Sequence, residues 1–476
     1  MATMLIVLVV CAAALFAVAW WSRRRIESEE DYLVAGRRLP VWLAWASLFA
    51  TWFGAGTLLT VSDEVRVRGL ERMALDPIGA GLCLLLGALL VARPLWRLKL
   101  LTLGDFYARR FGAASELVAS ALMIPGYLGW VAVQFTALAQ VLEVYVGLPA
   151  GWGVIVVAAV GTAYTLVGGL WSVTITDALQ TVVLLAGVLV LAWATFAALG
   201  GGDVVDGWRE LVARTPPALL SPWPRGGAGT IGWIALLCAG ALGNLPSQDL
   251  SQRIAAVRDE RSARRACTIA GVLYLVFGVI PPLVALAGRI IAARAGVRPA
   301  SMLPWLGQHV LSPAWSAVFL VATCAAVLSS ITSGVLAASS LLSQNIVARV
   351  PALDARAGSA LRRNHTSVGV VGALSLAIAA LGKRAYDLLA STYEIGVVGL
   401  LVPLVAGLHV ARGGQRAALV SMLAGSALWT LHLAFGWETL FGPGLGAVLP
   451  LPRALACFFI SAIAYALFAT RDAVRA

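Results

Sequence analysis

Charged residues are scarce in this sequence: Asp, Glu, Lys and Arg together make up 12% of its 476 residues. With 60% hydrophobic residues and a mean hydropathy of +0.88, this composition excludes an ordinary soluble globular domain. No segment between the hydrophobic runs is long enough for a separate soluble domain. We therefore expect one membrane-embedded domain over residues 1–476.

Residue patterns typical of metal and nucleotide chemistry are also missing. The four histidines are dispersed, and the six cysteines fall inside apolar runs without metal-ligand spacing or a pair suited to a disulfide. There is no Walker sequence, which argues against ATP-driven transport. No span holds a nucleophile–base pair, so we do not expect an enzyme.

The net charge of +12 comes from basic residues scattered over the loops that flank the hydrophobic runs. Such a distribution favours anchoring to anionic lipid over nucleic-acid binding. No kinase or receiver domain follows the last hydrophobic run, which argues against a membrane sensor.

Long hydrophobic runs make up most of the chain. A helix needs about 20 apolar residues to cross a bilayer, which predicts about thirteen transmembrane helices. The first run is too long for a signal-peptide core, so we expect it to be retained. The predicted spans are residues 4–22, 41–62, 74–92, 114–142, 152–172, 174–199, 231–250, 267–292, 314–346, 366–382, 386–408, 417–434 and 452–470.

Basic residues indicate the orientation. Most of the 35 Lys and Arg residues lie in loops 23–40, 93–113, 251–266, 347–365 and 409–416 and in the tail from Arg471. The positive-inside rule puts these segments in the cytoplasm. We expect a multi-pass protein of the plasma or inner membrane, with its N-terminus outside and its C-terminus in the cytoplasm.

Two spans carry helix breakers. The second holds Gly54 and Gly56, and the seventh holds glycines, an asparagine and a proline within 240–249. They lie five spans apart and so cross the membrane in opposite directions. This pattern predicts two inverted repeats of five helices, over about 41–199 and 231–408, each opening with a broken helix. One extra helix would precede the repeats and two would follow them.

Neutral oxygen atoms inside two spans indicate a sodium site. Ser329 and Ser330 follow Ala326 by three and four residues, so a helix brings their hydroxyls near its carbonyl, which keeps a free lone pair. A break at Gly54 would free further carbonyls for other partners. Serine pairs in membrane helices often only bond back to their own helix, which is the alternative. The predicted sodium ligands are Ala50, Phe53, Ala326, Ser329 and Ser330.

Several motifs occur in an order that we know from one transporter family. They are DYLVAGR at 31–37, FATWFGAG at 49–56, GGLWSV at 168–173, TDALQ at 176–180, QDLSQR at 248–253, AVLSS at 326–330 and SQNI at 343–346. In these stretches the chain resembles the solute:sodium symporter family, whose members have the LeuT-type fold. The resemblance implies sodium as the coupling ion and a conserved sodium site at the same five positions.

Within that family, the nearest resemblance is to the choline-transporter group. By this resemblance Trp52 and Trp130 would face the solute, because aromatic faces hold a quaternary ammonium by cation–π attraction. Ser247 stands where that group has another tryptophan, so the predicted cage is incomplete. Ser247 itself, Gly54 in the break and Gln134, one turn after Trp130, are further predicted solute contacts.

Carboxylates within spans are costly to bury and usually functional. Glu394 is predicted to face a cationic solute or to take up a proton. Asp177 is predicted either to stabilise the start of its helix or, by resemblance, to line the cytosolic exit path of sodium. Asp76 is expected to cap a helix at the interface, and Asp249 and Arg253 are expected to form a surface ion pair.

The sequence thus predicts a sodium-coupled symporter that imports a small polar solute, with a cationic amine among the candidates. The alternatives are a proton-coupled carrier that uses Glu394 or Asp177, and a non-transporting sensor on the same fold. Expected partners are the solute, sodium and the bilayer.

Overall fold

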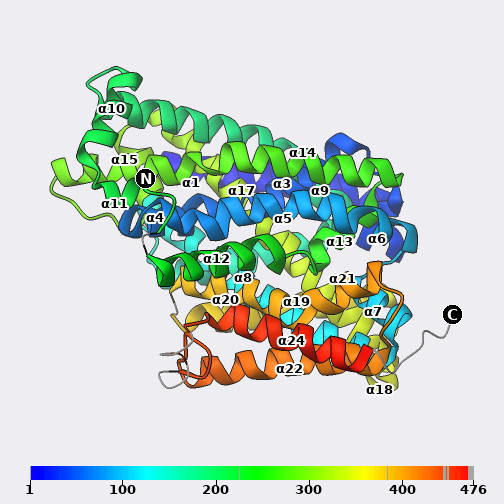
Figure 1. Cartoon of the computed structure of the whole chain (residues 1–476). Helices are drawn as coiled ribbons and strands as arrows, with labels where there is room; N and C mark the ends of the chain where they lie inside the picture. The colour runs from blue at the N-terminus through cyan, green and yellow to red at the C-terminus, as the bar shows by residue number, and fades with distance from the viewer. Residues whose placement is uncertain (1, 225, 383, 443–445, 447–449, 470–476) are drawn as a thin grey trace.

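The described part of the chain is built from helices. The computed structural model describes residues 2–224, 226–382, 384–442, 446 and 450–469, and in these ranges two isolated β-bridges are the only strand-like pairings. The helices run along one common direction and form a single bundle (Figure 1). The basic tail from Arg471 lies outside the described residues.

The helices that build the bundle are α1 (Ala2–Ser22), α3 (Val41–Trp52), α4 (Ser62–Arg68), α5 (Ala80–Leu86), α6 (Ala92–Leu98), α7 (Leu103–Phe111), α8 (Ala113–Val146), α9 (Ala150–Leu199), α12 (Gly227–Gly243), α13 (Gln248–Ala256), α14 (Glu260–Gly278), α15 (Ile280–Arg294), α17 (Pro313–Leu341), α19 (Ala360–Ala380), α20 (Ala385–Ile395), α21 (Leu401–His409), α22 (Gln415–Ala434) and α24 (Arg453–Ala469). Wider π-helical turns join some of them: η3 (Gly56–Val61), η5 (Leu75–Gly79), η6 (Gly87–Val91), η7 (Leu342–Ile346) and η9 (Gly396–Leu400). Helices at the two ends of the bundle are α2 (Glu29–Val34), α10 (Val204–Arg214), α11 (Pro217–Leu220), α16 (Met302–His309) and α18 (Pro351–Ala357).

Length and composition suit these helices to a membrane. Among the described residues, nine helices are long and apolar enough to cross it, or ten if the bent pair at Val41–Arg68 counts as one span. The prediction of an all-α integral membrane fold is confirmed. Every predicted span overlaps a helix, but the total of about thirteen stays a prediction.

The longest helix, α9, covers two predicted spans. Fifty residues of straight helix would extend about 75 Å, more than twice the hydrocarbon thickness of a bilayer. Gly169 breaks it with φ 51° and ψ −160°. A side chain there would also lie 2.8 Å from the backbone oxygen of Tyr32. Both the positive φ and the close approach require glycine.

The first predicted break is present. Helix α3 ends at Trp52, Phe53 has a non-helical ψ of 56°, and the chain resumes in η3 and α4 at an angle of 47°. The Gly54 amide donates to the carbonyl of Trp52 at 2.9 Å, and not to that of Ala50, which a continuous helix would use. A side chain at position 54 would overlap Ser330.

The second predicted break is present too. It separates α12 from α13 at residues 244–247, where Pro246 has no amide hydrogen to donate. Just before it, α12 crosses two neighbours with backbone against backbone. A Cβ at Gly240 would overlap the carbonyl of Leu75 at the start of η5, and one at Gly243 would overlap that of Tyr393 near the end of α20.

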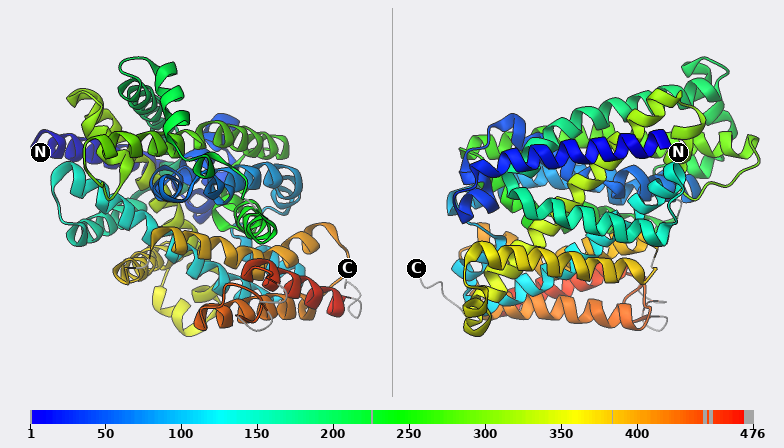
Figure 2. Two further views of the ribbon diagram at one scale, coloured as in Figure 1. Left: turned by 60° about the vertical axis from the view of Figure 1, so that its left-hand side comes forward. Right: turned by 180° about the vertical axis from the view of Figure 1, so that it is seen from behind.

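Helix α17 lies at the centre of the bundle, packed against α9, α8 and α3. Every residue from Ala325 to Leu341 is buried. By contrast, α1 exposes Leu5, Ile6 and Val9, as expected of a helix that faces lipid. Helices α22 and α24 pack together at one edge of the bundle (Figures 1 and 2). Helix α1 begins at the end that carries α10 and α11, and α24 ends at the opposite end (Figure 1).

Candidate functional site

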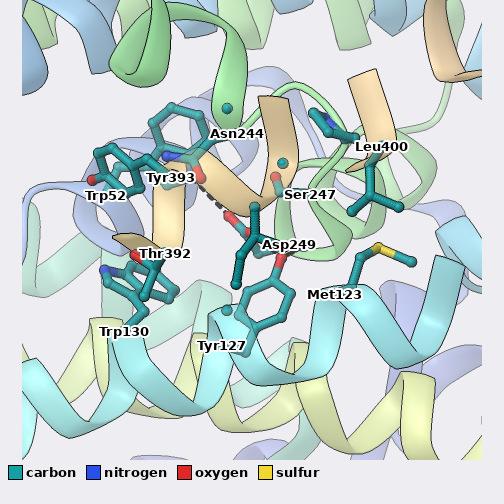
Figure 3. A pocket seen from close by; sticks show the side chains of 15 residues that line it. Trp52, Met123, Tyr127, Trp130, Asn244, Ser247, Asp249, Thr392, Tyr393 and Leu400 are labelled. Atoms are coloured by element: carbon teal, nitrogen blue, oxygen red, sulfur yellow. Dashed lines mark hydrogen bonds between the residues drawn. The ribbon is translucent and has the colours of Figure 1, made fainter. Parts of the chain in front are cut away.

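A cavity lies where the two broken helices meet, between α8 and the junction of α20 with η9 (Figure 3). Its volume is about 60 Å³, which is room for about four water molecules. It is lined by Trp52, Met123, Gly126, Tyr127, Trp130, Gly243, Asn244, Pro246, Ser247, Asp249, Thr392, Tyr393, Ile395, Gly396 and Leu400. Both breaks therefore contribute to one wall of the same space.

The charged group of the cavity is Asp249, in the first turn of α13. Its carboxylate accepts hydrogen bonds from Trp52 Nε1 at 2.7 Å and from the Tyr127 hydroxyl at 2.5 Å. The same hydroxyl accepts from the Asp249 amide at 3.0 Å. The residue is only 3% exposed. The positive end of the helix dipole favours a carboxylate in this position.

The predicted surface pair of Asp249 and Arg253 is wrong, because both residues are buried. The Arg253 guanidinium reaches the backbone carbonyl of Asp249 at 3.2 Å and otherwise points to other helices. Helical spacing brought the two residues together but could not reveal that α13 lies inside the bundle. Among the described residues, no basic side chain forms an ion pair with the Asp249 carboxylate.

Aromatic rings surround much of the cavity (Figure 3). Trp52 and Trp130 line it, as predicted, and Ser247 lines it as well. Tyr127 and Tyr393 complete the wall, and the rings of Tyr127 and Trp130 lie 6.1 Å apart. We did not predict the two tyrosines. The spacing of Tyr127 and Trp130, one helical turn apart, was a signal that could have indicated the first.

Of the predicted sodium ligands, Ser330 lies against the first break. The Ser330 hydroxyl donates to the carbonyl of Thr51 at 2.7 Å and lies 3.4 Å from that of Ala326. Thr51 sits between Ala50 and Phe53, the two predicted carbonyl ligands. The Ser329 hydroxyl donates to the Asp177 carboxylate at 2.5 Å. Each serine hydroxyl therefore donates its hydrogen bond to another group, and the lone pairs on its oxygen remain available.

Asp177 forms a buried pair with Arg253. The guanidinium lies 3.7 Å from the carboxylate, and the two side chains are 1% and 0% exposed. Asp177 also accepts from Ser47 at 2.6 Å. Arg253 donates to Thr51 at 2.5 Å and to Ser333 at 2.6 Å. Because Asp177 lies eight residues past the break at Gly169, the helix-start interpretation is wrong.

The structure does not bring Glu394 into the cavity. Its carboxylate accepts from Trp429 Nε1 at 2.6 Å and pairs with Arg453 at 2.8 Å, on α22 and α24. Residue 394 lies about 100° around the helix from Tyr393, so it points to the other side. The solute role predicted for Glu394 is therefore wrong, since its charge already has a partner that sequence spacing could not show.

Two other predicted solute contacts lie behind the cavity wall. Gln134 Oε1 accepts from the Ala55 amide at 2.8 Å, so it satisfies the free end of the resumed helix. Gly54 packs against Ser330 and Gln134. Neither residue lines the cavity.

The interfacial role expected for Asp76 is wrong. It is 1% exposed and accepts hydrogen bonds from Thr57, Tyr274 and Tyr393. The residues next to Asp76 in the sequence are apolar, and its tyrosine partners lie on two helices far along the chain. Sequence spacing therefore could not predict these hydrogen bonds.

Comparison with known proteins places this architecture in a family. The model of the sodium:solute symporter family matches residues 32–425. The chain is 28% identical to the human high affinity choline transporter 1 over 384 residues, which cover 76% of this chain and 64% of that protein. It is 25% identical to its counterpart in Caenorhabditis elegans, of which it covers 58%. It is 23% identical to the sodium/pantothenate symporter of Haemophilus influenzae, with 71% and 69% covered. The chain thus spans about three fifths of the length of these choline transporters.

Solved structures show the same fold. The chain is similar to a Na+-coupled sialic acid symporter with a TM-score of 0.79 and 19% identity, covering 98% of this chain and 96% of that one. A nucleobase-cation-symport-1 family transporter in a closed conformation gives a TM-score of 0.56, with 92% of each chain covered. The LeuT-type fold predicted from the sequence is confirmed, and the family match extends over most of the chain. This protein belongs to the sodium:solute symporter family.

Proposed function

We propose that this protein is a sodium-coupled symporter that imports a small cationic amine. The observation that carries the proposal is the Asp249 carboxylate. It is buried on the wall of a cavity between two broken helices and has no basic partner among the described residues. Hydrogen bonds from Trp52 and Tyr127 hold it in place. A cationic solute would supply the missing countercharge.

The cavity wall suits a cation in a second way. A desolvated cation over an aromatic face gains about 2 kcal/mol, and four aromatic residues line this cavity: Trp52, Tyr127, Trp130 and Tyr393. A carboxylate buried in the membrane is costly unless something offsets its charge. The similarity to choline transporters supports the same class of solute.

The polar part of the cavity wall narrows the class of solute further. Ser247 and Asn244 line the cavity at the second break. In choline transporters a tryptophan is expected at the position of Ser247, so the solute here meets one aromatic face fewer. We infer that the solute carries a hydrogen-bonding group, such as an amine hydrogen or a hydroxyl, beside its cationic centre.

We propose sodium as the coupling ion, bound by the carbonyls of Ala50, Phe53 and Ala326 and the hydroxyls of Ser329 and Ser330. The carbonyl end of α3 carries the negative pole of the helix dipole, which favours a cation. The hydroxyl of Ser330 lies against the break. The ion would join α3 of the first half to α17 of the second.

Coupling follows from that bridge. Sodium would stabilise one relative position of the two halves, and the solute cavity lies directly beside the break. One charge that moves across 100 mV contributes about 2.3 kcal/mol.

We propose repeats over about 41–199 and 231–408, with the N-terminus outside. In support, α6 and α7, which carry basic residues, lie at the end opposite α10 and α11 (Figure 1).

The two acids considered for proton coupling fit that role poorly. Glu394 pairs with Arg453, and Asp177 pairs with Arg253. Each of these carboxylates therefore already has a charge partner within the bundle.

The test is a thermal-shift screen of the purified protein with amines, amino acids, sugars and carboxylates, in sodium and in potassium. We expect a cationic amine to stabilise the protein in sodium. Asp249→Asn should weaken binding of that amine at least about 30-fold, because loss of a buried charge partner costs about 2 kcal/mol or more.

The matched control is Asp387→Asn, which removes an exposed acid on α20. It should bind the amine like the wild type. A neutral or anionic solute as the only stabilising compound, or unchanged amine affinity in Asp249→Asn, would contradict the proposal.

A further inference from the structure

A cluster of oxygen atoms surrounds Asp76 beside the first break. Thr57 donates to Asp76 Oδ1 at 2.7 Å, and Tyr393 donates to Oδ2 at 3.2 Å. The Tyr274 hydroxyl lies 3.2 Å from both carboxylate oxygens and 2.9 Å from the carbonyl of Trp52. It also contacts Thr57 Oγ1. These groups come from five helical segments: α3, η3, η5, α14 and α20.

The cluster has fewer hydrogens than contacts. Its oxygen atoms make six contacts: Thr57 with Asp76, Thr57 with Tyr274, Tyr274 with each carboxylate oxygen of Asp76, Tyr274 with Trp52 and Tyr393 with Asp76. The three hydroxyls supply one hydrogen each. An ionised carboxylate adds none, whereas a protonated one adds a fourth. Oxygen atoms this close therefore favour one additional proton.

Asp76 is 1% exposed, yet among the described residues no arginine, lysine or histidine forms an ion pair with it. The ionisable side chains nearest to it are Tyr274 on α14 and Tyr386 and Tyr393 on α20. Cys83 on α5 lies near Tyr393, and Arg72 just before η5 lies near Tyr386. Arg72 forms its ion pair with Glu71 instead. A buried carboxylate without a cation either takes a proton or lies at a functional site.

The spacing of the oxygens favours a proton over a metal ion. Contacts of 2.7 to 3.2 Å are those of shared hydrogens. Oxygens that surround a calcium-sized ion at about 2.4 Å lie about 3.4 Å apart in an octahedral arrangement. The present cluster is too tight to hold such an ion at its centre.

The geometry points to a proton-binding site at Asp76 that releases its proton when sodium binds. The carboxyl group is linked to the sodium site through Tyr274, which touches the carbonyl of Trp52 next to the predicted ligand Phe53. An ionised Asp76 attracts sodium, and a neutral one does not. Proton and sodium therefore oppose each other, and sodium affinity rises with pH.

Tyr393 provides the route for the proton. Its hydroxyl donates to Asp76, and the residue also lines the cavity. When Asp76 ionises, the O–H bond of its carboxyl group breaks and a water molecule in the cavity takes the proton. Uptake is the reverse step, so nothing besides water is needed.

A first experiment needs neither sodium nor solute. Infrared spectra of the purified wild type should contain the C=O stretch of a protonated carboxylic acid, which decreases as pH rises. Asp76→Asn should lack that component, and the exposed-acid control Asp387→Asn should keep it. An identical band in wild type and Asp76→Asn would overturn the assignment.

A second experiment tests the link to sodium, which rests on the sodium site proposed above. In thermal-shift titrations, the wild type should lose affinity for sodium by about fivefold or more as pH falls, the lower end of typical coupling between two ligands. Asp76→Asn should bind sodium weakly at every pH, and Asp76→Glu should restore the pH dependence. Full pH dependence in Asp76→Asn would overturn the link.

Two further measurements distinguish failure of the proton site from failure of the sodium site. If Asp76→Asn fails to fold, the wild-type infrared band must still decrease when sodium replaces potassium in a protein that responds to sodium, or the link between proton and sodium is wrong. Tyr393→Phe keeps the acid and should retain the band. If the wild type shows no sodium response but has the titrating band, the proposed sodium site fails while the proton site stands.

Discussion

Ser329 illustrates how a single side chain can serve two groups at the candidate ion site. Its hydrogen goes to Asp177, so its lone pairs are left for a cation. Asp177 is in turn held by Ser47 and lies near Arg253. We therefore regard Asp177 as a residue that positions Ser329, rather than as a ligand of the ion.

Replacing both serines with alanine should abolish the sodium response. Each hydroxyl lost from a charged contact costs about 2 kcal/mol, which is about 30-fold in affinity. In thermal-shift titrations, Ser329→Ala combined with Ser330→Ala should show no difference between sodium and potassium.

Ser339→Ala is the matched control, because this hydroxyl only bonds back to Leu336 within α17. It should keep the sodium response. A normal response in the double variant would rule out the proposed ligands.

At this scale the sequence predicted local spacing well and distant partners poorly. The meeting of Ser330 with the first break followed from helical periodicity and the two glycines. The burial of Arg253, the tyrosines around Asp76 and the pairing of Glu394 with Arg453 all depend on which helices become neighbours. No local pattern in one sequence carries that information.

The second broken helix is held near its break by glycine crossings. At Gly240, the backbone of α12 meets the segment at Leu75 and Gly79 directly. The absence of side chains lets the helices approach closely, as is common between membrane helices. The breaks themselves were predicted, because glycine and proline interrupt helices and are visible in the sequence. The crossings were not, since they need a partner element.

Gly240→Ala should therefore destabilise the protein. The added methyl group would overlap the carbonyl of Leu75, and overpacking of this kind costs about 1–3 kcal/mol. A lower melting temperature in detergent is the expected result.

Gly369→Ala on α19 serves as the control. A side chain there meets nothing within 4 Å, and alanine favours a helix over glycine. Its melting temperature should not fall. Equal stability of the two variants would show that the crossing at Gly240 is looser than described.

The molecule as a whole has two chemically different ends. Exposed Ala218 on α11 lies at the end where α1 begins, and exposed Ala355 on α18 lies at the opposite end. The basic residues that decide orientation lie mostly near the second end. The order of the helices could be predicted from hydropathy, whereas the membrane side of each end is inferred from charge alone.

Cysteine labelling in intact cells would test this orientation. A membrane-impermeant thiol reagent should label Ala218→Cys from outside, and Ala355→Cys only after the cells are made permeable. The wild type gives the background of the native cysteines, which are buried or half-buried. The reverse labelling pattern would invert the proposed topology.

The small volume of the cavity has a consequence for anything that enters it. A space for about four waters leaves no room for an ammonium together with its hydration shell. A cationic amine that binds there, as we propose, would have to lose its hydration shell, and the rings and the Asp249 carboxylate would replace that water. Amines with bulkier substituents would then obstruct the entrance, and would act as inhibitors instead of cargo.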